Sequence, residues 1–314
     1  MALLNKKKLK VVLALGGGGS RGLAHLGVLR ALLESGIPIS GIAGTSMGSV
    51  IGALYCETLD IEIMYERIES YLSSQKFREF ESDTLSEQRF EEFWSNLFAR
   101  FKKQVAVNLA LQKISLGDAA ELHNALDYLI HAKTFEDLQI PFTCVADDLK
   151  SGSKVVLKEG NLKPALIASS SVPGYLPPVE YGNYLLCDGM LTSVIPTIEA
   201  AELGDFIIAV DVRQDINYTE EFESALDILI RSDLISANFR ADILGQKADV
   251  LICPDVGEYG WNDFSNWRGI IEEGYNATVK AIPGIIKKLR EKRTFIYRYG
   301  LDPLYLFYRK FIKQ

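Results

Sequence analysis

The chain has 314 residues, of which 48% are hydrophobic and 24% charged, a globular composition that excludes a collagen-like, coiled-coil or largely disordered protein. Its formal charge of -7 argues against nucleic acid as a partner, because phosphate binding needs a basic face. The cysteines are far apart and form no CxxC pair, which predicts buried free thiols in a reducing compartment and no metal site. They are Cys56, Cys144, Cys187 and Cys253.

The N-terminal residues do not predict a secretion signal. Only the apolar run Val11 to Leu15 precedes the first glycines, and it is too short for the apolar core of a signal peptide. The uncharged stretch Gly36 to Cys56 is rich in small residues and fits two short buried elements around a turn better than a membrane span. We therefore expect a cytoplasmic protein, with peripheral contact to the inner face of the membrane as an added hypothesis.

The first elements follow the order strand, loop, helix, strand. The run Lys10 to Leu15 predicts a buried strand, and a glycine-rich loop, Gly16 to Gly22, follows it. Apolar residues at helical spacing predict a helix from about Gly22 to Ser35, and a second strand is predicted near Ile39 to Ala43. This order indicates a parallel sheet with crossover helices.

The pentapeptide Gly44-Thr45-Ser46-Met47-Gly48 follows the second strand and fits a nucleophile elbow, a tight turn from a strand into a helix. Gly44 and Gly48 flank the turn where side chains would clash. Ser46 would stand at a helix N-terminus, where N–H groups favour developing negative charge, so Ser46 is the candidate nucleophile. For the pentapeptide alone, a small-residue turn with a capping serine is an equal alternative.

From Asp60 to about Lys113 the pattern changes to long amphipathic helices, which predicts a helical, cap-like insert at about residues 60–115. One aromatic stripe at helical spacing consists of Phe90, Phe93, Trp94, Leu97, Phe98 and Phe101. Two interpretations stay open for the stripe. It is either an ordinary helix face packed on the core or a cap over an apolar substrate channel.

Strands resume after the insert, at residues 140–146, 154–157, 184–187, 206–210 and 250–253. The strand at Tyr184 to Cys187 places Asp188 at its C-terminal end, next to Gly189. No linker or repeat divides the chain. We expect a single domain over residues 1–314, with an α/β core at about 10–255 and a helical C-terminal extension at about 265–314.

The last 25 residues are basic and aromatic. Residues 290–314 hold seven lysines or arginines against two acids, interleaved with tyrosines and phenylalanines. That composition suits a contact with a membrane surface. Packing on the body of the protein, or on a second subunit, explains it equally well.

Three interpretations compete for the glycine-rich loop. Gly17, Gly19 and Gly22 have dinucleotide-binding spacing, but the acidic residue expected about twenty positions later is missing. A Walker phosphate loop is excluded, because Leu23 and not a lysine follows Gly22. An oxyanion hole fits well, since the N–H groups of Gly17, Gly18 and Gly19 can converge on one oxygen. Arg21 would then anchor the loop or an anionic substrate.

A serine nucleophile needs a base, and a triad of serine, acid and histidine would place a histidine after the acid. The three histidines, His25, His123 and His131, all precede Asp188. His25 is expected in the core, and the other two on the surface. A dyad in which Asp188 accepts the Ser46 proton directly is the simplest arrangement.

Together these segments resemble the bacterial patatin-like phospholipase family over Val11 to about Arg213. The stretches that carry the resemblance are, in order, GGGGSRGLAHLGVLRALLESGI, GTSMGSVIGALY, CVADDLKSG, SSSVPGYLPPVEYGNYLLCDG and IIAVDV. The resemblance implies a three-layer α/β/α fold with a mainly parallel central sheet and hydrolysis of lipid acyl esters without metal or cofactor. Ser46 matches the nucleophile and Asp188 the base, while Gly17, Gly18, Gly19 and Arg21 match the oxyanion loop.

Two positions depart from the family pattern. Met190 follows Asp188-Gly189 where the family has glycine or alanine, and Ser193 stands where it often has asparagine. Bulk at Met190 is expected to narrow the site. The expected function is a serine acyl hydrolase acting on phospholipid or lysophospholipid esters. The alternative is a non-catalytic lipid- or nucleotide-binding protein on the same fold, and an oxidoreductase would require NAD binding.

Overall fold

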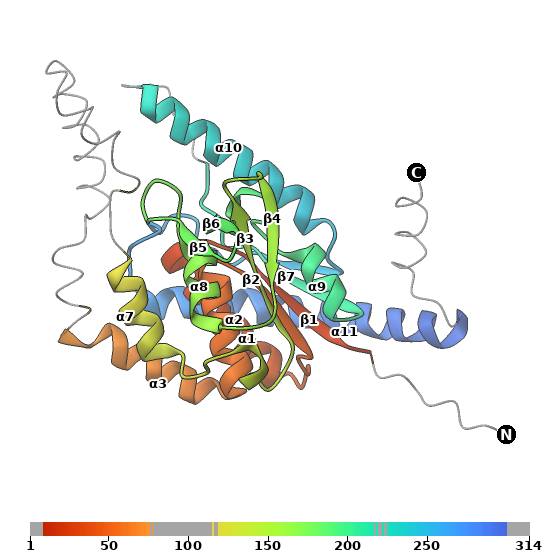
Figure 1. Ribbon diagram of the computed structural model, residues 1–314. Helices are drawn as coiled ribbons and strands as arrows, with labels where there is room; N and C mark the ends of the chain where they lie inside the picture. Colours follow the sequence, from red (N-terminus) through yellow and green to blue (C-terminus); the bar gives the residue numbers. More distant parts are fainter. Residues whose placement is uncertain are drawn as a thin grey trace, which may run out of the picture.

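The computed structural model describes residues 9–75, 77, 115, 119–216, 218, 222 and 225–299 (Figure 1). These residues build one eight-stranded sheet in the order β5-β6-β3-β2-β1-β7-β8, with β4 also paired to β3. The strands are β1 (Val11–Leu15), β2 (Gly41–Thr45), β3 (Phe142–Asp148), β4 (Ser153–Leu157), β5 (Val179–Tyr181), β6 (Tyr184–Asp188), β7 (Phe206–Val210) and β8 (Val250–Ile252). β1, β2, β3, β7 and β8 run parallel, and β4, β5 and β6 pair antiparallel.

Helices cover both faces of the sheet, which confirms the three-layer α/β/α arrangement with a mainly parallel sheet. The α-helices are α1 (Ala24–Glu34), α2 (Met47–Thr58), α3 (Ile61–Leu72), α7 (Ala120–Leu129), α8 (Leu162–Ser170), α9 (Thr197–Leu203), α10 (Ala225–Gly245) and α11 (Trp267–Tyr299). Short 3-10 turns are η1 (Gly19–Leu23), η3 (Phe135–Asp137) and η4 (Gly189–Leu191). Within the described ranges, no helix is long and apolar enough to cross a membrane.

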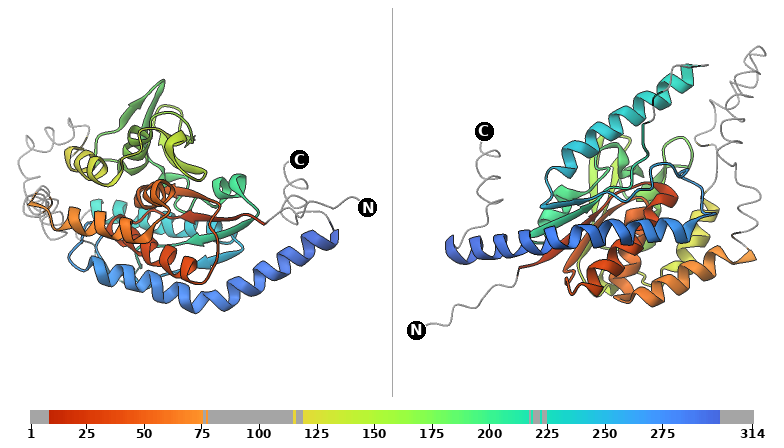
Figure 2. Two further views of the ribbon diagram at one scale, coloured as in Figure 1. Left: turned by 90° about the horizontal axis from the view of Figure 1, so that it is seen from below. Right: turned by 180° about the vertical axis from the view of Figure 1, so that it is seen from behind.

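β1 shows why the central strands are apolar throughout. Leu13 and Leu15 belong to a core cluster with α1, α2 and α11, whereas Val12 and Ala14 pack in a second cluster with α9 and α10. Successive side chains point to opposite faces, so a strand with both faces covered has no position left for polar residues. Figure 2 shows α11 running along the outside of α1.

The register around β3 places two strand ends against each other. Gly44 of β2 and Leu157 of β4 both pair with Cys144, so β2 and β4 lie on opposite sides of β3. Asp188 of β6 and Val155 of β4 both pair with Ala146, so β6 lies on the same side of β3 as β2. β6 therefore continues the position of β2, and the C-terminal ends of the two strands meet.

Several boundaries differ from the sequence prediction. The second strand covers 41–45 and not 39–43, because β2 and β1 pair from Gly41 onward, so the first two residues of the elbow belong to the strand. The short strand β5 was not predicted. Cys253 is exposed beyond the end of β8, contrary to the expected burial, while the other three thiols are buried. Of the predicted insert, α3 is described, and the aromatic stripe at 90–101 lies outside the described residues, as does the chain after 299.

Candidate active site

Ser46 occupies a strained turn between β2 and α2. Its backbone has φ 53° and ψ -128°, and among the described non-glycine residues only Ser46 and Leu59 have positive φ. Such a conformation costs free energy and persists where the surroundings fix it, as at a nucleophile elbow. Ser46 is also the N-cap position of α2, so its side chain stands at the positive end of the helix.

Gly44 and Gly48 must be glycines because neighbouring backbone atoms occupy the space that a side chain would need. A Cβ atom on Gly44 would lie 2.4 Å from the Cα of Ser49, and one on Gly48 would lie 2.2 Å from the carbonyl oxygen of Leu15. Both distances are shorter than any tolerated contact between these atoms. Gly44 and Gly48 thus let α2 begin directly against the ends of β1 and β2.

Serine hydroxyls hold the elbow in place. Ser49 Oγ donates to the Ser46 carbonyl at 2.6 Å, and the Ser46 N–H donates to Ser169 Oγ at 3.2 Å. Ser169 Oγ in turn donates to the carbonyl oxygen of Val145 at 2.6 Å. Ser169 therefore ties the elbow to β3. Ser169 lies in the last turn of α8.

Ser193, one of the two departures from the family pattern, supports the elbow by its backbone. The Thr45 hydroxyl donates to the Ser193 carbonyl at 2.7 Å, and Ser193 Oγ donates to Glu199 of α9 at 3.0 Å. Glu199 is itself buried and forms an ion pair with Lys154. These contacts join the end of β2 to the start of α9.

Asp188 ends β6 beside the elbow, in the position set by the β3 register. The side chain is 1% exposed, its Oδ1 accepts the Met190 N–H at 3.0 Å, and its Oδ2 has no regular hydrogen-bond partner among the described residues. Burial raises the pKa of Asp188 to about 7, and the negative charge of Asp147 adds to the rise. Hydrogen bonding from the Ser46 side chain opposes this rise in pKa. Catalytic hydrogen bonds are often long in a free enzyme.

A carboxylate with a pKa near 7 is a suitable general base, since it is ionised at neutral pH and basic enough to take a hydroxyl proton. The structure brings the hydroxyl of Ser46 and the carboxylate of Asp188 together. The arrangement can support attack by a serine oxygen on an electrophilic carbon.

The glycine-rich loop lies against the elbow. The N–H groups of Gly16 to Gly19 differ in whether they are hydrogen-bonded within the protein. The N–H groups of Gly16 and Gly17 donate to the carbonyls of Val210 and Val194, each at 3.0 Å. Those of Gly18 and Gly19 make no hydrogen bond within the part of the chain that the structure describes. Gly18 is the N-cap of η1 and Gly19 is its first residue, so their N–H groups are available to a ligand at the N-terminus of this turn.

Arg21 fastens this loop to the loops beyond β7 and β8. Its Nε donates to the Val212 carbonyl at 3.1 Å and its Nη1 to the Tyr259 carbonyl at 2.7 Å, with the side chain only 4% exposed. The N–H of Ser20 also donates to Trp261, and Ser20 Oγ donates to Gly260 at 2.7 Å. Of the two roles considered for Arg21, anchoring the loop matches these bonds.

The residues 259–261 were not singled out in the sequence. They act through backbone carbonyls, which any residue type supplies, so no side-chain pattern could reveal them. Tyr175 and Trp261 add a further contact near the loop, with ring centroids 4.8 Å apart at 85°. The glycine loop is therefore held from a part of the chain beyond the predicted core boundary at about 255.

None of the histidines is placed as a base. His25 is buried and its Nε2 donates to the Gly16 carbonyl at 2.8 Å. Burial lowers the pKa of His25 to about 4, so its imidazole is neutral and supports the glycine loop. His123 and His131 are exposed, as expected.

Met190, the second departure, lies over the glycine loop. A Cβ atom on Gly17 would be 2.8 Å from both Cγ and Sδ of Met190, and 3.1 Å from the Cβ of Ser46. Met190 and Ser46 therefore flank Gly17 on adjacent sides. The thioether thus lies close to the serine, and the narrowing of the site by Met190 stays a prediction.

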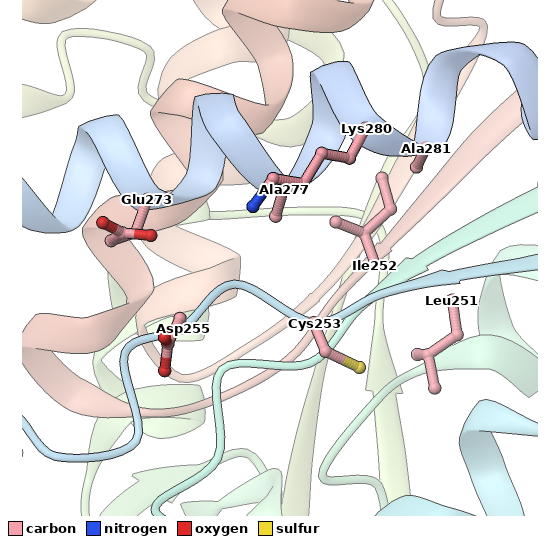
Figure 3. A pocket seen from close by; sticks show the side chains of 8 residues that line it. All are labelled: Leu251, Ile252, Cys253, Asp255, Glu273, Ala277, Lys280 and Ala281. Atoms are coloured by element: carbon pink, nitrogen blue, oxygen red, sulfur yellow. The ribbon is translucent and has the colours of Figure 1, made fainter.

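A cavity of about 320 Å³ lies elsewhere, between the end of β8 and α11 (Figure 3). Its lining residues are Leu251, Ile252, Cys253, Asp255, Glu273, Ala277, Lys280 and Ala281. None of them belongs to the elbow, the glycine loop or the Asp188 turn. Within the described ranges, no group of three or more histidine, cysteine or acidic side chains is arranged to hold a metal ion.

Comparisons with known proteins point to one family. A family model described as "Patatin-like phospholipase" matches residues 13–201, which is more than half of the chain. The "Patatin-like phospholipase domain-containing protein ZK370.4" of Caenorhabditis elegans is 34% identical over 203 residues, covering 64% of this chain and 13% of that protein. The "Lysophospholipase NTE1" of Debaryomyces hansenii is 30% identical over 330 residues, covering 92% of this chain and 20% of that protein.

A bacterial relative is the "Uncharacterized NTE family protein Mb1092c" of Mycobacterium bovis, 31% identical over 206 residues, covering 65% of this chain and 49% of that protein. The relatives thus include eukaryotes and mycobacteria, and the match is to the family without restriction to a bacterial branch. The chain spans between about an eighth and half of the length of these relatives. Among solved structures, VipD from Legionella pneumophila has a TM-score of 0.47 at 13% identity, covering 88% of this chain and 67% of VipD.

Proposed function

Because the chain belongs to the patatin-like phospholipase family, we propose that it is a serine acyl hydrolase that cleaves lipid acyl esters through Ser46 and Asp188. The observation that carries the proposal is the meeting of β2 and β6 on β3. It brings a serine in a strained elbow beside a buried carboxylate whose pKa is raised to about 7.

The reaction would proceed through an acyl-enzyme. Ser46 Oγ attacks the ester carbonyl carbon while Asp188 accepts the hydroxyl proton, and that proton passes to the departing alcohol. A water molecule then attacks the acyl-enzyme, with Asp188 again as base, and releases the fatty acid and Ser46. Each half-reaction passes through a tetrahedral intermediate with a negatively charged oxygen.

Gly18 and Gly19 are the proposed donors to that oxygen, because their N–H groups make no hydrogen bond among the described residues and lie at the N-terminus of η1. Each such donor contributes about 3 kcal/mol of transition-state stabilisation in acyl-transfer enzymes. Gly17 and Arg21, which the family resemblance places in the same loop, support these donors. Gly17 has no side chain that would clash with Met190, and Arg21 holds the backbone of the loop by hydrogen bonds.

The names of the relatives, a phospholipase domain and a lysophospholipase, make phospholipid and lysophospholipid esters the proposed substrates. Such substrates reside in or near lipid surfaces. A cytoplasmic protein with peripheral contact to the inner face of the membrane would meet them there, and the chain needs no nucleic-acid partner for this chemistry.

The test is release of p-nitrophenol from medium-chain esters by wild type, Ser46→Ala and Asp188→Asn. Both variants should lose at least about a thousandfold of kcat, since a nucleophile or its base contributes that much in comparable systems. Free fatty acid released from a panel of phospholipids and lysophospholipids would then name the substrate. Retained activity in Ser46→Ala would contradict the proposal.

The alternative stays a non-catalytic lipid- or nucleotide-binding protein on the same fold. An intact serine and carboxylate in hydrogen-bond interaction favour catalysis over that alternative. The hypothesis of an oxidoreductase would require measurable binding of NAD.

A further inference from the structure

Two buried carboxylates lie close to the candidate active site without belonging to the dyad. They are Asp147 of β3, which is 4% exposed, and Glu199 of α9, which is 2% exposed. A buried carboxylate lowers the stability of a fold unless donors or an opposite charge compensate it. The donors that compensate these two therefore show which part of the chain the two carboxylates hold.

The donors belong to two consecutive residues, Thr192 and Ser193. Asp147 Oδ1 accepts the Thr192 hydroxyl at 2.6 Å, and its Oδ2 accepts the Thr192 N–H at 3.1 Å. Glu199 Oε2 accepts the Ser193 hydroxyl at 3.0 Å. Thr192 is exposed, whereas Ser193 is fully buried. Asp147 thus holds Thr192 by both its main chain and its side chain.

Lys154 of β4 supplies positive charge to both carboxylates. Its ammonium forms an ion pair with Glu199. Lys154 also pairs directly with Asp147 across the antiparallel β3–β4 ladder, so the two side chains lie on one face of the sheet. Burial raises the pKa of Asp147, and the Thr192 donors and the charge of Lys154 oppose this rise.

The residues that these carboxylates hold are part of the turn that carries the base. We call residues 188–193 the Asp188 turn. The Met190 N–H donates to Asp188 Oδ1 at 3.0 Å, and the Ser193 N–H donates to the Gly189 carbonyl at 2.8 Å. Because the turn is closed by its own hydrogen bonds, a displacement of Thr192 would also displace Asp188.

The end of the Asp188 turn also contacts the other two parts of the site. The Thr45 hydroxyl, next to the candidate nucleophile Ser46, donates to the Ser193 carbonyl at 2.7 Å. The Gly17 N–H donates to the carbonyl of Val194, the residue after the turn, at 3.0 Å. The segment that the two carboxylates hold therefore joins the base, the elbow and the glycine loop.

We propose that Asp147 is a positioning residue of this hydrolase, which holds the Asp188 turn through Thr192 and acts on Asp188 by its negative charge. The inference rests on the proposed hydrolysis by Ser46 and Asp188, and it adds a residue to that reaction. Lys154 and Glu199 support Asp147 from the neighbouring strand and from α9.

Asp147 acts on the base without direct contact. Asp147 pairs with Cys187 and Asp188 pairs with Ala146, so the two carboxylates occupy neighbouring positions on opposite faces of the sheet. Burial is the larger cause of the rise in the pKa of Asp188 to about 7, and the charge of Asp147 adds to it. If a neutral residue replaces Asp147, this second cause is lost and the pKa of Asp188 falls.

The other titratable groups near the two carboxylates do not reverse this sign. Burial raises the pKa of Cys187 to about 12, so its thiol is neutral. The Ser151 hydroxyl and backbone donors lower the pKa of Asp148 to about 2, so Asp148 keeps its charge over the pH range of interest. Lys154 and Glu199 form their ion pair with each other.

The kinetic experiment uses a soluble p-nitrophenyl ester. Thr192→Val removes the hydroxyl that donates to Asp147 and keeps the size of the side chain. It should lose about tenfold of kcat with an unchanged KM, as a displacement of the base by less than about 1 Å would cause. Thr192→Ser restores the hydroxyl and should recover most of the loss.

The matched control is Asp249→Asn. Asp249 also accepts a backbone N–H, that of Ile207 at 2.8 Å, and also pairs with a lysine, Lys292. Those contacts lie near the start of β7, at the opposite end of the strands from Ser46. Asp249→Asn should therefore lower the melting temperature and leave kcat unchanged.

A titration separates positioning from a role in folding alone. The Asp188 carboxyl is followed by carbon NMR in protein labelled at the aspartate carboxyls, and its signal is assigned by its absence from Asp188→Asn. In Asp147→Asn, the Asp188 midpoint and the acid limb of kcat/KM should both move to lower pH. In Asp249→Asn both should stay at their wild-type positions.

Three results would overturn the positioning role. They are an unchanged Asp188 midpoint in Asp147→Asn, a wild-type kcat in Thr192→Val, and an equal loss of kcat in Asp249→Asn. If Asp147→Asn does not fold, the kinetics of Thr192→Val decide, because Thr192 is exposed. A wild type that hydrolyses no ester, with a midpoint that moves as expected, would contradict the proposed function and leave the action of Asp147 on Asp188 standing.

Discussion

At the scale of single residues, the raised pKa of Asp188 ties activity to pH. The carboxylate must be ionised to accept the Ser46 proton, and burial raises its pKa to about 7. We expect kcat/KM for a soluble ester to be half-maximal near pH 7, to fall about tenfold per pH unit below it, and to level off above it. A profile that is flat from pH 5 to pH 8 would contradict a buried carboxylate base.

We expect Met190 to limit the space in front of Ser46, because its thioether lies against Gly17 beside that serine. Met190→Ala should raise kcat/KM for long-chain p-nitrophenyl esters relative to short-chain ones by about tenfold, the scale of a few methylene groups gaining contact in an apolar pocket. Leu191→Ala, one residue further and exposed, is the matched control and should leave the ratio unchanged. The same chain-length profile in wild type and Met190→Ala would refute this role.

At the scale of elements, the start of α2 depends on the absence of a side chain at Gly48. A Cβ there would lie 2.2 Å from the Leu15 carbonyl and 2.7 Å from that of Gly16, both of which are backbone atoms that cannot turn aside. Gly48→Ala should lower the free energy of unfolding by about 3 kcal/mol, at the upper end of overpacking costs, and reduce activity with it. Chemical denaturation measures the change.

Gly284→Ala is the control for this substitution. Gly284 lies inside α11 with no atom within 4 Å of its added Cβ, so alanine should stabilise the helix by up to about 1 kcal/mol. An equal effect of the two substitutions would show that the close approach at Gly48 is unimportant.

The sequence allowed the parallel strands and the elbow to be predicted, because strands covered on both faces are apolar throughout and because Gly44 and Gly48 mark a crowded turn. Ser46 and Asp188 could be proposed as site residues for a related reason: each stands at a strand end with a glycine within two residues. The position of β6 in line with β2 could not be predicted, since it depends on which side of β3 each strand pairs. Nor could the carbonyl contacts of Tyr259 and Trp261, which leave no side-chain signal.

At the scale of the whole molecule, the active-site carboxylate lowers the stability of the fold. The pKa of Asp188 is 3.8 in a model peptide and about 7 in the folded protein, so the folded state binds more protons between these values and stability falls as pH rises from about 4 to 7. The full cost above pH 7 is at most about 4 kcal/mol.

Asp188→Asn removes this titration while keeping the shape of the side chain. Its melting temperature should exceed that of wild type, by an amount that grows between pH 4 and pH 7 and is constant above pH 7. Scanning calorimetry at several pH values measures the difference. If the difference in melting temperature shrinks as pH rises, the fold stabilises the ionised carboxylate and the account of its raised pKa is wrong.

The most direct test of the Ser46-Asp188 dyad is covalent labelling by a fluorophosphonate, followed by intact-protein and peptide mass spectrometry. We predict one adduct on the peptide that contains Ser46 in wild type, none in Ser46→Ala, and labelling slowed by about a thousandfold in Asp188→Asn, because the base that activates the hydroxyl is lost. Folded wild-type protein that takes up no label, or an adduct that persists in Ser46→Ala, would contradict the assignment of Ser46 as the nucleophile.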